Sequence, residues 1–408
     1  MTGQVSHSPT VVIVGASLGG LRTASALRRS GFDGRITLVG DEPHLPYDRP
    51  PLSKEVLTRE KRPDDTFFRT AVFFEEQRID LKLGAAAVGL DAEARSISLA
   101  TGEEVDYDFA VIATGARPRT LPGTGDIDGV HVMRTLADAT AIRASFDRGR
   151  RLVVVGAGFI GSEVAASARK RGMEVTIIEA ADQPLVMAVG AQVGERCAGL
   201  HGLYGAELRC GIGVTGVDEE SGSLVVRLSN GSTASCDTVV VGIGVIPNVE
   251  WLEGSGIEMD RAVICDRYMR TSHPGVYAVG DLASWENPRF GRRMRVEHWT
   301  NTVEQSATVA RNIVNTIAGA TPIAYAGIPY FWSDQYGHRL QLVGLASDDE
   351  VAFVHDPPGE PGMLALYRRG DRLGGAFAID SMGPLMKMRR MLFQEAGFDE
   401  ALEFATSL

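Results

Sequence analysis

Two glycine-rich turns, far apart in the chain, each lie between an apolar run and a helical pattern that leads into a second apolar run. The first copy begins with VVIV at 11–14, and its second apolar run is ITLV at 36–39. The second copy begins with LVVV at 152–155 and ends in EVTIIE at 174–179. A strand, a tight turn, a helix and a parallel strand within about 30 residues form a dinucleotide-binding unit. The repeat predicts two such units, and no other feature constrains the fold as strongly.

The second turn is a complete GxGxxG, GAGFIG at 156–161, in the expected strand-to-helix context. Its glycines permit the tight turn, the approach of a pyrophosphate to the backbone, and close packing of helix and strand. Glu179 stands at the end of the next strand, and no arginine follows at Ala180 or Ala181. A carboxylate there accepts hydrogen bonds from an adenosine ribose and repels a 2′-phosphate. This turn therefore predicts a site that prefers NAD over NADP.

The first turn, GASLGG at 15–20, departs from the rule because Ser17 replaces the middle glycine. Serine is small and can donate a hydrogen bond to a phosphate, so the turn still predicts a phosphate loop, although its match to the pattern is weaker than that of the second turn. Asp41, with Glu42 beside it, stands at the end of the next strand. Two nucleotides in one chain indicate a hydride relay between two cofactors.

Composition excludes several classes of protein. A chain of 408 residues predicts two to four domains. The 41 Lys and Arg against 52 Asp and Glu give a net charge of −11, which argues against nucleic acid as the main partner. The first ten residues lack the basic and apolar regions of a signal peptide, and no apolar stretch is long enough to span a membrane. We therefore expect no membrane association and a cytoplasmic location.

The chain's thiols and imidazoles do not predict a metal site. The four cysteines, at 197, 210, 236 and 265, form no CxxC pair, and the eight histidines show no ligand spacing. We expect the cysteines to be buried thiols in a reducing compartment.

Two further segments bear on cofactor binding. An apolar strand, FAVIATGARP, is predicted at 109–118 and contains Ala113-Thr114-Gly115, and a later buried run leads into Gly280-Asp281. An aspartate directly after a buried strand and a glycine can bond a polyol chain, although it can also be an exposed turn residue. From Gly327 onward the pattern changes, and a separate α+β domain is predicted from short β-like runs at 339–345, 363–369 and 372–379.

These features together resemble the glutathione reductase superfamily of flavoproteins with two dinucleotide domains. Within it, the chain is similar to the ferredoxin reductases of bacterial oxygenase systems over nearly its whole length, through RPPLSK at 49–54, RTL at 134–136, EHW at 297–299 and FWSDQ at 331–335. The resemblance implies an α/β fold with two Rossmann-like dinucleotide-binding domains, for FAD and NAD, and a C-terminal α+β interface domain. The implied boundaries are 1–116 and 245–326 for the FAD domain, 117–244 for the NAD domain and 327–408 for the interface domain.

The resemblance also implies roles for single residues. Lys54 would reach the flavin and stabilise negative charge on it, and Glu163 would orient Lys54. Asp281 would bind the ribityl chain, and Trp299 would lie against the isoalloxazine. The implied FAD residues are Gly15, Ser17, Gly19, Gly20, Asp41, Arg49, Lys54, Ala87, Thr114, Gly115, Arg134, Gly280, Asp281 and Trp299. The implied NAD residues are Gly156, Gly158, Ile160, Gly161, Glu163, Glu179 and Gly244, and the catalytic set is Lys54, Glu163 and Trp332.

The absence of cysteine from residues 41–70 bears on the electron acceptor. Disulfide reductases of the superfamily carry a redox cysteine pair there, and related peroxidases and oxidases carry one cysteine. Without a thiol relay, electrons must leave from the flavin itself, which favours a one-electron protein acceptor. Trp332 could mark the exit or be a core tryptophan. Two basic clusters could steer an acidic ferredoxin or be merely solvated: Arg292, Arg293 and Arg295, and Lys387, Arg389 and Arg390.

The sequence thus predicts an NADH-dependent FAD enzyme that reduces a small iron-sulfur ferredoxin serving an oxygenase. A rubredoxin reductase would differ mainly in the acceptor. A non-enzymatic alternative is an NADH-sensing flavoprotein resembling apoptosis-inducing factor, which is disfavoured because no basic tail or long C-terminal insertion is present.

Overall fold

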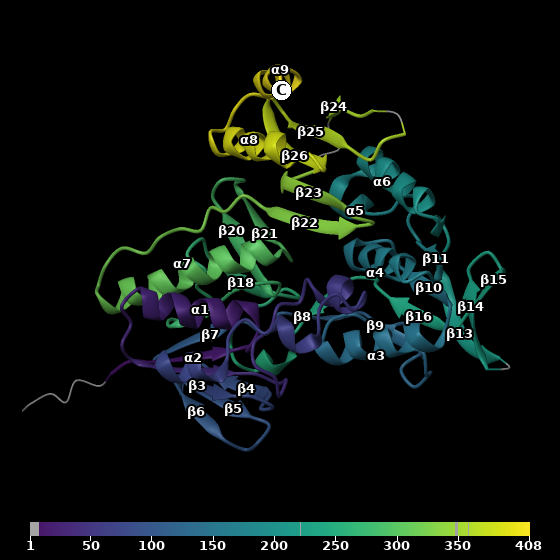
Figure 1. Cartoon of the computed structure of the whole chain (residues 1–408). Helices are drawn as coiled ribbons and strands as arrows, with labels where there is room; N and C mark the ends of the chain where they lie inside the picture. The colour runs from purple at the N-terminus through teal and green to yellow at the C-terminus, as the bar shows by residue number, and fades with distance from the viewer. Residues whose placement is uncertain (1–7, 221, 347–349, 358) are drawn as a thin grey trace, which may run out of the picture. The chain divides into compact units, whose positions relative to one another are not determined.

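The computed structural model describes residues 8–220, 222–346, 350–357 and 359–408, which divide into two compact units (Figure 1). The first unit contains the chain up to Asp48 together with Phe67–Arg117 and Pro247–Gly327. The second unit contains Arg49–Thr66, Pro118–Ile246 and Ile328–Leu408. Two short strands, β8 (Ala116–Pro118) and β17 (Val245–Pro247), lie at two of the places where the chain passes from one unit to the other.

A five-stranded parallel sheet forms the centre of the first unit. Residues Val11, Val12 and Ile13 are fully buried, as expected for a parallel strand covered on both faces. Helices α1 (Leu18–Arg29) and α7 (Trp299–Ile317) pack against each other (Figure 1). The sheet order is β19 (Val276–Ala278), β7 (Phe109–Ile112), β1 (Thr10–Val14), β2 (Arg35–Val39) and β3 (Ile79–Lys82), and the short helix α2 (Ala71–Glu76) contacts β3.

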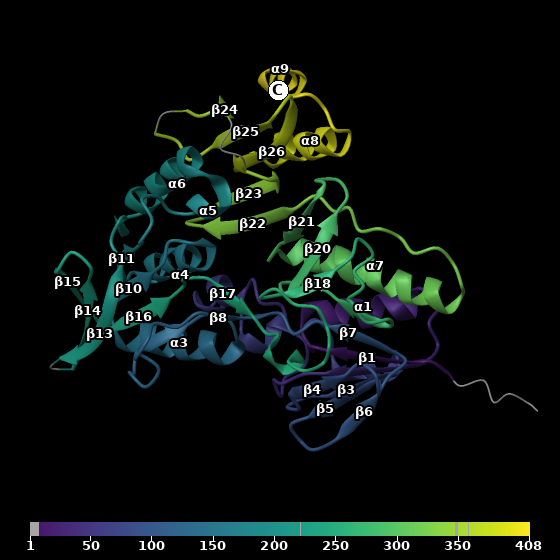
Figure 2. The same ribbon diagram turned by 180° about the vertical axis from the view of Figure 1, so that it is seen from behind.

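Two smaller three-stranded sheets complete the first unit, as Figure 2 shows from behind. The antiparallel one consists of β4 (Ala87–Asp91), β5 (Ser96–Leu99) and β6 (Glu104–Asp106). The mixed one consists of β18 (Val263–Cys265), β20 (Ala283–Asn287) and β21 (Arg292–Arg295). A 3-10 turn, η3 (Glu250–Leu252), contacts β4.

A second five-stranded parallel sheet belongs to the second unit. Its order is β12 (Glu207–Arg209), β11 (Glu174–Ile178), β10 (Arg151–Val155), β16 (Thr238–Val241) and β9 (Val130–Val132). The helices of this part are α3 (Leu136–Arg148), α4 (Phe159–Lys170), α5 (Val186–Val189) and α6 (Ala191–Leu203). An antiparallel sheet of β13 (Val214–Glu220), β14 (Ser223–Leu228) and β15 (Thr233–Cys236) buries an apolar face beside β10.

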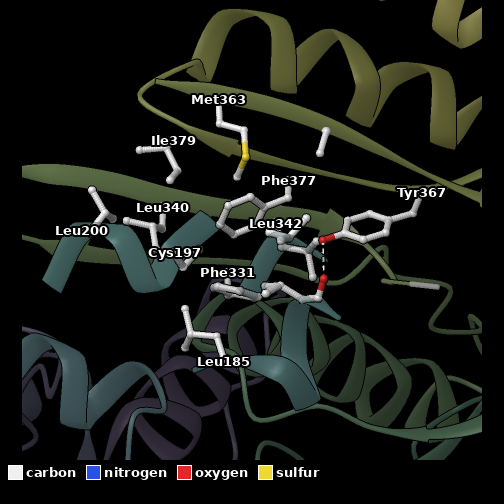
Figure 3. Close-up of a cluster of buried hydrophobic side chains, with 13 residues drawn as sticks. Leu185, Cys197, Leu200, Phe331, Leu340, Leu342, Met363, Tyr367, Phe377 and Ile379 are labelled. Atoms are coloured by element: carbon white, nitrogen blue, oxygen red, sulfur yellow. Dashed lines mark hydrogen bonds between the residues drawn. The ribbon is translucent and has the colours of Figure 1, made fainter. Parts of the chain in front are cut away.

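The C-terminal part of the second unit is a five-stranded antiparallel sheet between two apolar layers. One layer joins the sheet to α5 and α6 (Figure 3), where the Tyr367 hydroxyl donates to the Val189 carbonyl at 2.7 Å. The other layer joins it to α8 (Met382–Phe393) and α9 (Phe398–Thr406). The sheet order is β22 (Tyr330–Gln335), β23 (His338–Gly344), β26 (Arg372–Ile379), β25 (Met363–Arg369) and β24 (Glu350–His355).

The segment Arg49–Thr66 groups with the second unit, whereas its position in the sequence associates it with the first FAD part. It contains the π-helical turn η1 (Leu52–Val56) and the 3-10 turn η2 (Pro63–Thr66). Side chains of α4 and of its C-cap residue hold the backbone of this segment, because Ser167 donates to the Ser53 carbonyl at 2.7 Å and Arg171 donates to the Leu57 carbonyl at 3.0 Å.

The α/β class and the two parallel dinucleotide sheets predicted from the sequence are confirmed. Across the described ranges, no helix combines the length and the apolar character needed to cross a lipid bilayer.

Candidate active site

The first glycine loop joins β1 to α1 in the first unit. Gly15 has a φ of 118°, and a Cβ built on it would lie 2.1 Å from the Ala113 carbonyl oxygen, so only glycine fits. Ser17 occupies the N-cap of α1 in an extended conformation. Gly19 and Gly20 are buried in the first turn of the helix. This loop thus has the shape of a dinucleotide loop despite its serine.

Helix α7 closes over the first loop. Ser306 donates to the Gly19 carbonyl at 3.1 Å, and the Gly280 amide donates to Gln305 Oε1 at 2.8 Å. Gln305 is fully buried, and its Nε2 has no hydrogen-bond partner within the described ranges. A buried donor without an acceptor costs free energy. The Nε2 donor of Gln305 therefore indicates that a bound ligand supplies an acceptor here. The residues present therefore fit FAD.

The other candidates of the first unit lie in the segments that follow strands β2 and β7, and in strand β4. Asp41 is exposed after β2, and its Oδ1 accepts the Glu42 amide at 3.0 Å. Thr114 donates to the Asn248 carbonyl at 2.7 Å, and the Gly115 carbonyl accepts the Asn248 amide at 2.9 Å. Ala87 is the first residue of β4 and pairs with Leu99. Asn248, which the sequence did not single out, holds the turn at Thr114 and Gly115.

Trp299, the first residue of α7, is held by two first-unit side chains that the sequence did not single out. Its Nε1 donates to Asp48 Oδ1 at 2.9 Å, and the Arg22 guanidinium lies 5.5 Å from its ring centroid. Burial lowers the pKa of Arg22 from its usual value. Next to it, burial lowers the pKa of His298 to about 4 although the Asp281 carboxylate opposes this shift, so His298 is neutral at pH 7. The ring of Trp299 is therefore held by a hydrogen bond to Asp48 and a cation–π contact with Arg22.

The second glycine loop joins β10 to α4 in the second unit. Gly156 has a φ of 99°, and a Cβ on it would lie 2.4 Å from the Gly242 carbonyl oxygen. Gly158 is the N-cap of α4, and a Cβ there would meet only the Gly242 carbonyl oxygen at 3.9 Å. The protein itself therefore leaves room above Gly158, which fits the approach of a pyrophosphate. Gly161 is buried within α4, while Ile160 is 42% exposed.

Glu179 follows β11 and borders the second loop. Its Oε2 accepts the Ala157 amide at 2.6 Å, and its Oε1 accepts the Ala181 amide at 2.8 Å. The carboxylate is thus held beside the glycine loop, where a ribose would lie. Gly244 has a φ of 93°, and its carbonyl accepts the Arg119 amide at 2.9 Å.

Lys54 and Glu163 form an ion pair of 2.7 Å between Nζ and Oε2 inside the second unit. Only 14% of the lysine side chain and 5% of the glutamate side chain are exposed. The Ser53 hydroxyl donates to the same carboxylate oxygen at 2.6 Å, and the Ser333 hydroxyl donates to Oε1 at 2.8 Å. A buried charge pair with its remaining lone pairs satisfied is costly to disturb. The two serines are site residues that the sequence motifs contained but did not reveal.

Arg49 and Arg134 lie close together in the second unit, since the Arg49 guanidinium donates to the Arg134 carbonyl. The Asp138 carboxylate accepts the Arg134 amide at 2.9 Å and forms a capping box with Thr135 at the start of α3. This cap fixes the backbone of the segment after Arg134.

Trp332 lies on the edge strand β22, stacked on Tyr330 with ring centroids 6.3 Å apart. The Arg389 guanidinium lies 5.6 Å from the Tyr330 centroid, so one basic side chain of the C-terminal cluster reaches this aromatic pair. In the other cluster, Arg293 donates to the Cys265 and Ser284 carbonyls. Arg295 pairs with Glu297. The cluster of Arg292, Arg293 and Arg295 is therefore partly engaged by neighbouring groups of the first unit.

Comparison with known proteins agrees with this geometry. Residues 9–306 match the family described as pyridine nucleotide-disulphide oxidoreductase, and residues 330–405 match the one described as reductase C-terminal. Rhodocoxin reductase of Rhodococcus erythropolis is 36% identical over 389 residues, which cover 95% of this chain and 90% of that protein. The ferredoxin–NAD(+) reductase component of the anthranilate 1,2-dioxygenase system of Burkholderia cepacia is 37% identical over 383 residues, 93% of each chain.

A solved structure, the covalent complex of putidaredoxin reductase with putidaredoxin, is similar with a TM-score of 0.90 and 30% identity, covering 98% of this chain and 99% of that one. The resemblance predicted from the sequence is confirmed. The chain belongs to the pyridine nucleotide-disulphide oxidoreductase family and carries its reductase C-terminal domain.

Proposed function

We propose that this chain takes hydride from NADH onto FAD and passes single electrons to a small iron-sulfur ferredoxin that serves an oxygenase. Two relatives are named ferredoxin–NAD(+) reductase components of dioxygenase systems, a third is named putidaredoxin reductase, and a solved relative is a complex with putidaredoxin. Bound FAD would supply the exchange between a two-electron hydride donor and a one-electron acceptor.

The observation that carries the proposal is the Lys54–Glu163 pair, whose lysine lies in a segment, residues 41–70, that holds no cysteine. The four thiols of the chain lie elsewhere, and burial raises the pKa of Cys197 and Cys265 to about 12 and that of Cys236 to about 11. Burial raises the pKa of Cys210 as well. Thiols that stay protonated are poor nucleophiles, so these cysteines are unsuited to relay electrons to a disulfide.

The chain's own residues divide the work between two sites. We propose that the first loop, Asp41, the Thr114 segment, Asp281 and Trp299 hold FAD, with Ala87 beside the adenine. The second loop, Glu179 and Gly244 hold NADH, and Glu179 excludes a 2′-phosphate by charge. The Lys54 ammonium faces the flavin and stabilises negative charge, while Glu163 fixes the ammonium in place. Arg49 and Arg134 complete the cofactor contacts, and Trp332 lies on the route of the departing electrons.

The domain boundaries given by the resemblance complete the proposal. The FAD domain would be 1–116 with 245–326, the NAD domain 117–244 and the interface domain 327–408. We further propose that the protein works in the cytoplasm, which is supported by cysteines that are free throughout the described ranges.

An anaerobic stopped-flow experiment tests this function. NADH should bleach the flavin absorbance of the purified protein, and the reduced protein should then reduce a [2Fe–2S] ferredoxin. Glu163→Gln should slow bleaching by about tenfold or more, because it removes a charge that orients Lys54. Brisk reduction of rubredoxin but of no ferredoxin would select the rubredoxin reductase. Bleaching by NADH without turnover of any protein acceptor would select an NADH-sensing role.

A further inference from the structure

The carboxylate of Glu163 receives hydrogen bonds from two different parts of the second unit. Its Oε2 accepts from Ser53 and Lys54, both in the π-helical segment. Its Oε1 accepts from Ser333, on strand β22 of the C-terminal sheet, and Ser333 is its only donor within the described residues. Ser333 is fully buried, Ser53 is 2% exposed and Glu163 is 4% exposed. Water is therefore excluded as a substitute partner.

The hydroxyl of Ser333 has one hydrogen to give, and its surroundings direct that hydrogen to Glu163. Gln335 Nε2 donates to Ser333 Oγ at 3.2 Å, so the serine oxygen already serves as an acceptor on its other side. Gln335 is itself 1% exposed and lies on the same face of β22. The serine is thus held in a donating orientation.

A ring contact sets the register between β22 and α4. Phe159 and Glu163 are four residues apart on one face of α4, and Phe331 and Ser333 are two residues apart on one face of β22. The rings of Phe159 and Phe331 pack with centroids 4.2 Å apart. The apolar pair and the polar pair Glu163–Ser333 therefore lie side by side and fix the carboxylate along the helix axis.

We propose that Ser333 is a positioning residue for hydride transfer: it anchors one oxygen of Glu163 so that the other stays aligned with Lys54. The inference rests on the proposed function, and it gives the C-terminal domain a part in the NADH half of the reaction. Trp332, the neighbouring residue, points to the opposite face of the strand, so β22 contacts the hydride site on one face and carries the proposed electron exit on the other.

The kinetic test measures flavin bleaching by NADH in Ser333→Ala, Ser333→Thr and the wild type. The alanine variant should lower the limiting bleaching rate by about tenfold, because a hydrogen bond to a buried charge is lost. The apparent Kd for NADH should stay within about twofold, since the change lies behind Glu163. The threonine variant keeps the hydroxyl and should stay within about twofold of the wild type.

A matched control uses another buried serine of the same unit. Ser145 is 3% exposed, and its hydroxyl bonds His131 Nε2 at 2.8 Å and accepts from Arg148 at 3.3 Å. Ser145→Ala should therefore leave the bleaching rate unchanged. If the threonine variant is less stable to heat than the wild type, Ser333→Cys, a weaker donor of similar shape, should fall between serine and alanine.

A second readout needs neither NADH nor turnover. The chain has only five lysines, at 54, 61, 82, 170 and 387, so the acylation rate of each amine can be followed by mass spectrometry after limited reaction. Ser333→Ala should raise the rate at Lys54 by about threefold or more relative to exposed Lys387, because a loosened carboxylate holds the ammonium less well. Glu163→Gln sets the upper limit, and the threonine and Ser145→Ala variants should match the wild type.

The two readouts separate the two claims. A wild-type protein whose flavin NADH cannot bleach would overturn the proposed function. The acylation rate of Lys54 would still test whether Ser333 positions Glu163. Ser333→Ala with wild-type bleaching and wild-type labelling would overturn the positioning role. So would threonine and cysteine variants as slow as alanine, since the loss would then come from packing.

Discussion

The two glycine loops of this chain share a backbone requirement but differ in what surrounds them. In each, the first glycine faces a carbonyl oxygen too close for a Cβ, that of Ala113 at Gly15 and that of Gly242 at Gly156. The middle position is Ser17 in the first loop and Gly158 in the second. Helix α7 covers the first loop through Ser306, whereas the space at Gly158 is open.

The difference separates what the fold needs from what the ligand needs. The first glycine is required by the turn itself, and both loops keep it. The middle residue is determined by how closely the nucleotide approaches the backbone. A serine is therefore tolerated in the first loop and not expected in the second. Glu179 is likewise tied to its loop by the Ala157 amide and also accepts the Ala181 amide, while Asp41 is exposed.

Exchanging the middle residues of the two loops should have the largest effect, and the effect on cofactor affinity should differ between the loops. Gly158→Ser should raise the Kd for NAD about thirtyfold, by about 2 kcal/mol, because the side chain fills the space for the pyrophosphate. The melting temperature should hardly change, since the protein leaves this space empty. Ser17→Gly should change FAD affinity by less than about threefold. Calorimetry and flavin release measure both, and equal effects in the two loops would refute the distinction.

Removing the acidic residue of each loop should give the next largest effect. The wild type should prefer NADH over NADPH by about tenfold or more in kcat/KM, and Glu179→Ala should remove most of that preference. Asp41→Ala should leave the preference intact, because it lies in the other dinucleotide unit. Steady-state rates with both nucleotides decide this, and a preference for NADH that Glu179→Ala leaves unaffected would place the determinant elsewhere.

A change outside both loops should leave both cofactor sites intact and act on the acceptor alone. Arg389→Glu with Arg390→Glu should lower ferredoxin turnover about fivefold at low salt and flatten its salt dependence, because surface charges act mainly on association rate. Bleaching of the flavin by NADH should be unchanged. If ferredoxin turnover also stays unchanged, the ferredoxin docks at the other basic cluster. In that cluster Arg293 donates to the Cys265 carbonyl and Arg295 pairs with Glu297.

The smallest effect concerns the foot of each dinucleotide sheet, where the two units use an aspartate in the same way. Asp108 accepts the Thr10 amide at 2.7 Å, and Asp237 accepts the amides of Arg150 and Arg151. The Arg151 guanidinium, which also bonds Asp237, holds the pKa of this carboxyl at about 2 in the folded protein. A carboxyl whose pKa is lower in the folded than in the unfolded protein stabilises the folded state above pH 4. This stabilisation is lost as the pH falls toward 2.

Asp237→Asn should therefore cost about 1 kcal/mol of unfolding free energy at pH 7, reduced from the full shift because the pair is partly exposed. The cost should shrink between pH 4 and pH 2. Urea unfolding at several pH values measures it, and a cost independent of pH would show that the amide bonds, not the charge, matter.

The sequence was informative wherever one local pattern decides the structure. The apolar runs at 363–369 and 372–379 coincide with β25 and β26, because their flanking turns mark strand ends. Both loops were predicted because the turn dictates glycine. Contacts over long sequence separations were not predictable: Ser333 and Glu163 are 170 residues apart, and Trp299 and Asp48 are 251 apart.

The grouping of residues 49–66 with the second unit was hidden for the same reason. The motif around Lys54 was visible, but Ser167 and Arg171, which hold the backbone of that segment, lie far along the chain, in α4 and at its C-cap. Serines carry no pattern that marks them as partners of a buried carboxylate. Their roles follow only when α4, η1 and β22 are brought together.

The stoichiometry of ferredoxin reduction tests the central claim most directly. The protein is treated with N-ethylmaleimide to block accessible thiols, given one equivalent of NADH without oxygen, and mixed with excess oxidised [2Fe–2S] ferredoxin. Our account predicts that two ferredoxins are reduced per NADH and that the treatment changes the rate by less than about twofold, because no thiol takes part. Loss of ferredoxin reduction after thiol blocking, or reduction of a disulfide in its place, would contradict it.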